Sequence, residues 1–262
     1  MTEESRLYVS LPLRMLEEQG PHFLSRRLQP EIAIKGPDFD DRALAGVLKR
    51  WAREFRAAGL GVSVHAPFMD LNPGALEPLV RAATLQRLSQ TLDAAARLGA
   101  RCVVVHPGYE RWRYGGNEDL WLEPSLEFWA PLVRRAQDAG IVLALENVFE
   151  EAPGSLERLL EGIDSAAFGH CFDVGHWHLF CRDKISLAEW FGRLGHRMVH
   201  LHLHDNRGDG DDHLPPGEGL IPFDELRGLV EEFAPRATLA LEVHDPEKLS
   251  PALVTVRSLF GV

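Results

Sequence analysis

Hydrophobic runs of strand length alternate with longer amphipathic segments along all 262 residues of the chain. The short runs are rich in β-branched and aliphatic residues, whereas the longer segments carry apolar residues at helical spacing. We expect helices over residues 41–58 and 75–98, and the second should end at Gly99. The expected strands are residues 6–12, 31–36, 61–67, 101–107, 141–147, 168–174, 198–204 and 237–243. In the second helix, the apolar positions at helical spacing are Leu79, Ala82, Ala83, Leu85 and Leu88.

Strands that alternate with helices are typical of a parallel α/β sheet, and eight such strands are the number that closes a barrel. No low-complexity tract or Pro/Gly/Ser linker interrupts the alternation. The pattern therefore predicts an α/β fold, a single (β/α)8 TIM barrel that occupies residues 1–262 as one domain.

Alternate residues within the expected strands differ in size, which indicates which face points into the barrel. In GVSVHAP, Gly61 and Ser63 lie in step with His65, while the opposite face carries valines. The same step leads to polar residues near the ends of other strands. These in-step series run through Cys102 and Val104 to His106, Val142 and Ala144 to Glu146, Gly169 and Cys171 to Asp173, and Thr238 and Ala240 to Glu242.

Strands three to eight each end in a side chain that can bind a metal. Barrel enzymes keep their chemistry at the carboxyl ends of the strands, so these side chains should converge on one mouth. Many carboxylates and imidazoles in one place repel and desolvate one another unless a cation joins them. We therefore expect a divalent metal held by residues drawn from His65, His106, Glu146, Asp173, His176, one of His200, His202 and His204, Glu242, and the loop residues Asp211, Asp212, His213 and Glu218.

Composition narrows the class of protein. The chain is 45% hydrophobic, has no stretch of membrane-spanning length and begins with the acidic segment MTEESRLYV, so we expect a cytoplasmic protein with no membrane partner. Cys102, Cys171 and Cys181 have no CxxC spacing, which argues against a disulfide framework or a zinc ribbon. The net charge of -11 disfavours a nonspecific nucleic-acid binder without excluding one.

Seven motifs, in order, carry a resemblance to a known superfamily. VHAPF, VVVHPG, LENV, CFDVGH, HLHDNRG, DDHLPPGEG and LEVH, between residues 61 and 244, resemble the xylose-isomerase-like barrels. This superfamily includes sugar and sugar-phosphate isomerases and epimerases, and also the endonuclease IV type of abasic-site nuclease. Its members are often oligomers, so the resemblance implies a homo-oligomer.

The resemblance to the epimerase-like members implies one Mn²⁺, Mg²⁺ or Zn²⁺ ion held by Glu146, Asp173, His202 and Glu242. A metal-polarised carbonyl makes the adjacent C–H acidic, and the two glutamates would move a proton between opposite faces of a sugar. His176 would lie near the substrate oxygens as a further catalytic residue, and Arg207 would hold a hydroxyl or phosphate of the substrate.

The resemblance to the endonuclease IV type implies a larger ligand set. Positions that match His65, His106, His176, Asp211 and His213 join the four core ligands there to hold three zinc ions. A multinuclear site of this kind activates water for phosphodiester cleavage. The sequence thus implies one ion, or up to three, and the ligands leave isomerase and hydrolase chemistry open.

Two loops bear on the choice of substrate. Residues 109–122, which include Trp112 and Tyr114, are rich in aromatic residues and predict a lid over a small substrate, with residues 177–184 as the opposite wall. A nuclease would instead insert Trp112, Arg113 and Tyr114 into a duplex. Because the chain has no basic run, we favour a metal-dependent isomerase or epimerase of a sugar or sugar phosphate, in carbohydrate metabolism. The alternatives are a zinc-dependent phosphodiesterase acting at abasic DNA sites and a sugar-binding protein without turnover.

Overall fold

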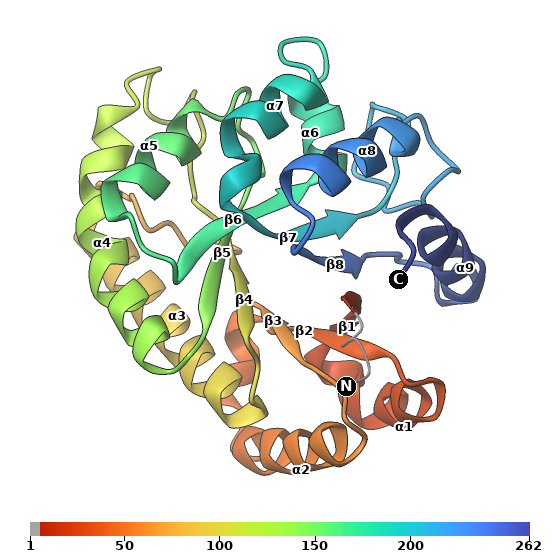
Figure 1. Ribbon diagram of the computed structural model, residues 1–262. Helices are drawn as coiled ribbons and strands as arrows, with labels where there is room; N and C mark the ends of the chain where they lie inside the picture. The colour runs from red at the N-terminus through yellow and green to blue at the C-terminus, as the bar shows by residue number, and fades with distance from the viewer. Residues whose placement is uncertain (1–5) are drawn as a thin grey trace.

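Eight parallel strands close into a barrel in chain order, and β8 pairs with β1 (Figure 1). The computed structural model describes residues 6–262, so the acidic segment 1–5 lies outside the described residues. The (β/α)8 fold predicted from the sequence is confirmed. The strands are β1 (Leu7–Pro12), β2 (Gln29–Ala33), β3 (Ser63–His65), β4 (Cys102–Val105), β5 (Val142–Glu146), β6 (Phe168–Asp173), β7 (Met198–Leu203) and β8 (Thr238–Leu241).

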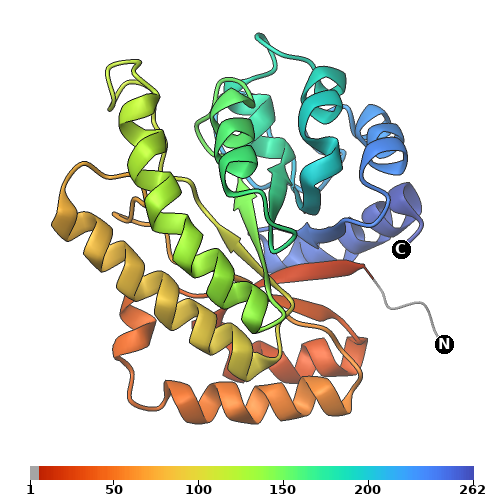
Figure 2. The ribbon, with the colours of Figure 1, turned by 60° about the vertical axis from the view of Figure 1, so that its left-hand side comes forward.

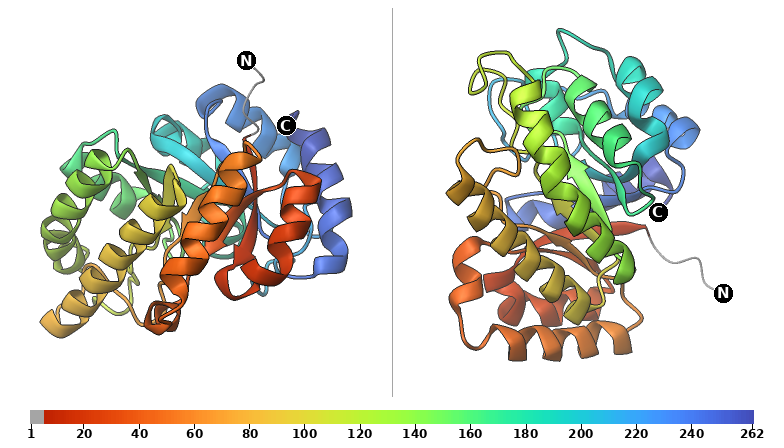
Figure 3. Two further views of the ribbon diagram at one scale, coloured as in Figure 1. Left: turned by 90° about the horizontal axis from the view of Figure 1, so that it is seen from below. Right: turned by 90° about the vertical axis from the view of Figure 1, so that its left-hand side faces the viewer.

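Helices surround the strands on the outside in the views of both Figures 1 and 3. The α-helices are α1 (Leu16–Arg26), α2 (Leu44–Ala57), α3 (Pro78–Leu98), α4 (Asp119–Asp138), α5 (Gly154–Ile163), α6 (Val174–Phe180), α7 (Leu187–Leu194), α8 (Phe223–Phe233) and α9 (Leu249–Phe260). Short 3-10 helices cover Leu13–Met15, Gly36–Asp40, Gly195–Arg197 and Pro246–Lys248. Among residues 6–262, no helix is both long and apolar enough to cross a membrane.

Element boundaries differ from the expected ones by a few residues. Strand β2 begins at Gln29 and ends at Ala33, because the chain then turns into the 3-10 helix that begins at Gly36. Helix α3 begins at Pro78, where the Glu77 side chain accepts a hydrogen bond from the Leu79 amide (3.0 Å) and so caps the helix. The expected stop at Gly99 is confirmed, since this residue adopts a left-handed conformation with φ of 73°.

The buried face of α3 is not the one that the apolar spacing indicated. Leu79 is 77% exposed and Leu85 is 41% exposed, whereas Thr84 and Leu88 are buried. The Thr84 hydroxyl accepts a hydrogen bond from the Asn72 amide (3.0 Å), which turns this face of the helix toward the loop after β3. The buried face of the helix continues from Thr84 through Leu88, Leu92 and Ala95.

The alternation of faces within the strands is confirmed by two separate apolar clusters. A small cluster of Val104, Ala144 and Cys171, with Cys102 and Val199 packed against it, fills the inside of the barrel. The outward residues of the same strands, such as Leu143 and Phe172, belong to the much larger layer between strands and helices. The apolar part of the barrel interior is therefore small, which leaves room for polar side chains.

Loops gather at one end of the barrel. The loop that precedes α4 and the connection between α6 and α7 project at the same end of the molecule (Figures 2 and 3). In a barrel of parallel strands, the carboxyl ends of all strands lie on one side, together with the loops that follow them. The candidate ligands predicted at the strand ends therefore lie at this end of the barrel, which we call its mouth.

Candidate metal centre

Strand ends position the core of the site. His65, Glu146 and Asp173 are the last residues of β3, β5 and β6, while His106 and Glu242 directly follow β4 and β8. Parallel pairing in register brings these ends to the same rim. All nine residues that the resemblance singled out lie within one connected network of imidazoles and carboxylates.

Glu146 joins two groups of imidazoles through its two carboxylate oxygens. Its Oε2 lies 3.2 Å from Nε2 of His65 and 3.0 Å from Nε2 of His106. Its Oε1 lies 3.4 Å from Nδ1 of His202 and 3.3 Å from Nδ1 of His176. A carboxylate with this arrangement is suited to bridge two cations.

His202 faces three carboxylates at once. Its Nδ1 lies 3.4 Å from Glu146, 3.6 Å from Asp173 Oδ2 and 3.8 Å from Glu242 Oε2. These four side chains are the core set that the resemblance implied, and they come from β5, β6, β7 and the end of β8.

A third group lies beside the core set. Asp211 Oδ2 lies 3.1 Å from Nε2 of His213 and 3.6 Å from Nε2 of His176. Nδ1 of His213 lies 3.7 Å from Glu242 Oε2, so the third group touches the second.

His204, which the sequence left as a rival to His202, also lies in the centre. Its Nε2 is 3.1 Å from both carboxylate oxygens of Asp173, and its ring stacks on His213 with centroids 3.9 Å apart. His213 stacks in turn on His244, which sequence reasoning missed. His200, the third candidate of the series, instead faces the barrel interior.

Backbone carbonyls fix the direction of several rings. Nδ1 of His65 lies 2.9 Å from the Ala66 carbonyl oxygen, and Nδ1 of His176 lies 2.9 Å from that of Asn147. A ring that donates from Nδ1 keeps Nε2 free of a proton and able to bind a metal. Both Nε2 atoms point at carboxylates of the centre, as metal ligands do.

The carboxylates and imidazoles of the centre shift one another's pKa values. Burial alone would raise the pKa of Glu146, but His106 and His202 hold it well below its usual range. Burial likewise opposes the charged form of His176, yet Asp173 and Asp211 raise its pKa well above its usual value. Contact with carboxylates therefore favours the protonated form of His176, whereas burial lowers the pKa of His106.

The donor set fits divalent metal ions. In the part of the chain that the structure describes, four groups of His, Asp and Glu have ligand atoms within 4.8 Å of one another. They are Glu31 with His200 and His202, His65 with His106 and Glu146, His204 with His213 and Glu242, and Glu146 with Asp173 and His202. Buried Nδ1 atoms of His202 and His204 have no hydrogen-bond partner among residues 6–262. Unpaired buried nitrogens are costly unless a ligand satisfies them, and mixed imidazole and carboxylate donors suit zinc or manganese.

Asp205 shapes the loop that carries Asp211 and His213, and sequence reasoning did not single it out. Its buried carboxylate accepts hydrogen bonds from the amides of Gly217 and Gly219 (both 2.9 Å) and of Ile221 (3.1 Å). Its backbone also pairs with Leu214. One side chain therefore closes the loop from residue 205 to residue 221.

Glu31 is a second residue that sequence reasoning missed. It is fully buried inside the barrel, below His202, and lies opposite Ser63 in the register of β2 and β3. Its signal in the sequence was a carboxylate at the first position of the expected strand 31–36, directly before the apolar residues 32–34.

Other expected site residues lie apart from the network. Asp212 is exposed, and Glu218 pairs with Lys248 (2.6 Å) at the surface. Arg207 is exposed and pairs with no acid among the described residues. In the expected lid, Trp112 is 77% exposed.

Tyr114, which the sequence analysis assigned to substrate binding, makes its contacts within the protein. The residue is buried, and its hydroxyl accepts a hydrogen bond from Asn72 (2.7 Å) and donates one to the Gly74 carbonyl (3.1 Å). Its ring stacks on Tyr109. Tyr114 thus anchors the loop that carries Trp112 to the loop after β3.

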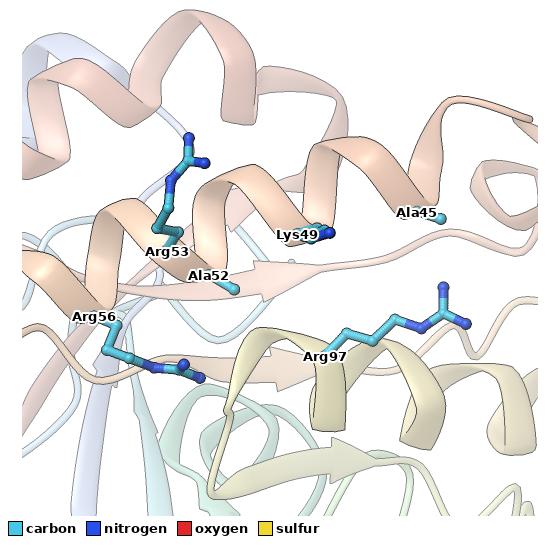
Figure 4. Close-up of a pocket in the computed structure, with 6 residues that line it drawn as sticks. All are labelled: Ala45, Lys49, Ala52, Arg53, Arg56 and Arg97. Atoms are coloured by element: carbon cyan, nitrogen blue, oxygen red, sulfur yellow. The ribbon is translucent and has the colours of Figure 1, made fainter.

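A hollow of about 510 Å³ lies on the outer wall between α2 and α3 (Figure 4). It contains none of the candidate ligands. Basic side chains dominate its lining, which consists of Ala45, Lys49, Ala52, Arg53, Arg56 and Arg97.

The closed barrel and the ligand groups at its mouth define the class of the protein as a (β/α)8 barrel with a candidate metal centre. Residues 26–258 match the family model for the xylose isomerase-like TIM barrel, and the chain belongs to this family. The resemblance inferred from the seven motifs is confirmed.

The relatives of the chain include an uncharacterized protein and a probable endonuclease. The uncharacterized protein MJ1311 of Methanocaldococcus jannaschii is 34% identical over 189 residues, which cover 69% of this chain and 64% of the relative. The chain thus spans less than two thirds of that relative's length. The probable endonuclease 4 of Mycobacterium leprae is 28% identical over 230 residues, covering 84% of each chain.

Two solved structures cover nearly the whole chain. The TTHB071 protein from Thermus thermophilus, in a crystal soaked with ZnCl2, has a TM-score of 0.82 and 30% identity, and covers 98% of each chain. A D-tagatose 3-epimerase-like protein has a TM-score of 0.85 and 26% identity, and covers 97% of each chain.

Proposed function

We propose that this protein is a divalent-metal-dependent phosphodiesterase with a multinuclear centre. The observation that carries the proposal is Glu146, whose two carboxylate oxygens face different groups of imidazoles. A centre for a single ion needs only the core set around His202, whereas His65, His106, Asp211 and His213 are built into the network as well. The sequence analysis favoured an isomerase, and we now prefer the phosphodiesterase because Glu146 faces both groups of imidazoles.

The protein's own residues would hold up to three ions in adjacent positions. His65, His106 and Glu146 would form the first site. Asp173, His202 and Glu242, again with Glu146, would form the second, and His176, Asp211 and His213 the third. When bound, such ions lower the pKa of water and neutralise the charge of phosphate and leaving-group oxygens.

A small phosphoester suits the surface better than duplex DNA does. The net charge is -11, and the basic hollow between α2 and α3 lies on the outer wall rather than at the mouth. A nuclease needs cations that follow the phosphate backbone beside its centre. Arg207, on the exposed loop after β7, is the cation that we propose to hold the phosphate.

Metal analysis and hydrolysis together test the proposal. We expect elemental analysis of the purified protein to give about two to three ions of zinc or manganese per chain. We also expect hydrolysis of bis(p-nitrophenyl) phosphate, faster than cleavage of a duplex with an abasic site. One ion per chain and no hydrolysis of either substrate would count decisively against a multinuclear phosphodiesterase.

The second candidate is a sugar isomerase or epimerase. It is favoured by the pair Glu146 and Glu242, whose carboxylates face the same nitrogen of His202 from different strands at 3.4 Å and 3.8 Å. Such a pair could remove and return a proton on opposite faces of a substrate. Deuterium incorporation into a ketose or ketose phosphate in D2O, with one ion per chain, would establish this function instead.

A further inference from the structure

A buried carboxylate lies directly beneath the candidate metal centre. Glu31 Oε1 is 2.9 Å from Nε2 of His202, and Glu31 Oε2 is 3.0 Å from Nε2 of His200. All three side chains have no exposed surface. Ser63 donates a hydrogen bond to Oε2 (2.8 Å), and Nδ1 of His200 lies 2.5 Å from the Thr238 hydroxyl.

His202 differs from other imidazoles of the centre in the nitrogen that it presents. His65 and His176 turn Nδ1 to a backbone carbonyl and Nε2 to the carboxylates. His202 turns Nδ1 to the carboxylates, so its Nε2 points into the barrel. Within residues 6–262, no backbone carbonyl accepts a hydrogen bond from that Nε2, and the acceptor beside it is Glu31.

We propose that Glu31 is a positioning residue that keeps the proton of His202 on Nε2 and so presents Nδ1 to the metal. This inference rests on the proposed metal centre and holds for either candidate reaction. A carboxylate behind a metal-binding imidazole fixes its tautomer and increases its basicity, and its loss typically lowers metal affinity about 10–100-fold.

The environment of Glu31 supports this role. Burial alone would raise the pKa of Glu31, but the charges of His200 and His202 hold it well below its usual range. The carboxylate is therefore an acceptor that faces two ring nitrogens. The contacts are at ion-pair distance, although Nε2 of His202 and Oε1 of Glu31 lack regular hydrogen-bond geometry.

The tautomer can be measured on the unaltered protein. In zinc-loaded protein labelled with 15N-histidine, we expect the ring shifts of His202 to show a proton on Nε2 and none on Nδ1. His202→Gln identifies the resonance by its disappearance. A His202 that carries its proton on Nδ1 in the zinc-loaded protein would overturn the proposal, and this measurement requires no change at Glu31.

The variant Glu31→Gln tests the effect on metal binding. We expect zinc affinity, measured by competition with a chromogenic chelator, to fall about 10–100-fold with the number of bound ions unchanged. Thr238→Val is the matched control, since Thr238 contacts His200 and not His202, and it should change affinity less than about 3-fold.

Two outcomes would overturn the proposal. An unchanged affinity in Glu31→Gln would show that His202 needs no partner. Loss of one ion, with the others bound as tightly as before, would make Glu31 and His200 ligands of their own cation. Absence of hydrolysis, by contrast, would contradict the phosphodiesterase alone and leave the affinity result standing.

Discussion

Glu146 is the residue on which the candidate centre depends most. Because it contacts the imidazoles of two groups, its replacement should affect more than one ion. We predict that Glu146→Gln binds fewer ions and lowers turnover by at least about 100-fold. Elemental analysis and steady-state kinetics provide the measurement, with the surface variant Glu218→Gln as control. Full metal content in Glu146→Gln would contradict the bridging role.

Glu150 illustrates a buried carboxyl outside the ligand set. It is 2% exposed, and burial is the main cause that raises its pKa from 4.5 to about 7, although the Val148 amide donates a hydrogen bond to it (2.6 Å). Because its pKa is raised in the folded protein, Glu150 contributes a stability that is fully present below pH 4.5. This contribution is lost as the pH rises from 4.5 through 7. The shift corresponds to about 3 kcal/mol over this range.

Replacement by the neutral amide should remove this pH dependence. We predict that the stability of Glu150→Gln relative to the unaltered protein increases by about 3 kcal/mol from pH 4 to pH 8. The measurement is urea unfolding in chelator at several pH values. Its exposed neighbour, changed in Glu151→Gln, should show no such trend. Parallel stability curves for Glu150→Gln and the unaltered protein would disprove the assignment.

At the scale of elements, the loop after β7 is held by one side chain. Asp205 accepts four backbone hydrogen bonds within the loop that carries Asp211 and His213. We predict that Asp205→Asn destabilises the protein by about 2–3 kcal/mol, since hydrogen bonds to a charged acceptor are lost. Calorimetry and metal analysis should show a lower melting temperature and partial loss of one ion. Asp209→Asn, on the exposed part of the same loop, should have neither effect.

Strand ends were predictable from the sequence, while features set by long-range contacts were not. Alternation of small and large residues placed Glu146 and Asp173 on the inner face, because a strand has a strict period of two. The buried face of α3 escaped prediction, because Thr84 is polar yet buried, whereas Leu79 and Leu85 are exposed. The hydrogen bond between Tyr114 and Asn72 could not be predicted either, because these residues are 42 positions apart in the chain.

Polar residues beneath the mouth were the other part that the sequence did not predict. Glu31 comes at the beginning of its expected strand, so the rule that site residues follow strand ends passed over it. Only its contacts with His200 and His202, more than 150 residues away in the chain, indicate a role. The roles of His200 and His202 on β7, and of His204 directly after it, could be distinguished only from their contacts in the structure.

At the scale of the whole molecule, metal removal should lower stability. Ligands that bind only the folded chain stabilise it by about 3–4 kcal/mol at 100 to 1,000 times their dissociation constant. For a chain of this size, we predict that excess chelator lowers the melting temperature by about 5–15 °C. Scanning calorimetry with and without EDTA measures the shift, and Glu146→Gln should respond less than the unaltered protein. Equal shifts in both would mean that the ion stabilises the protein elsewhere.

The closed barrel also determines when a metal could first bind during folding. Candidate ligands run from His65 on β3 to Glu242 after β8, so the complete set exists only when most strands have paired. Bound ions would cross-link distant segments, and we predict that these links form after the folding transition state. Zinc should therefore slow unfolding in guanidinium and leave the refolding rate nearly unchanged, so the centre would extend the lifetime of the native state.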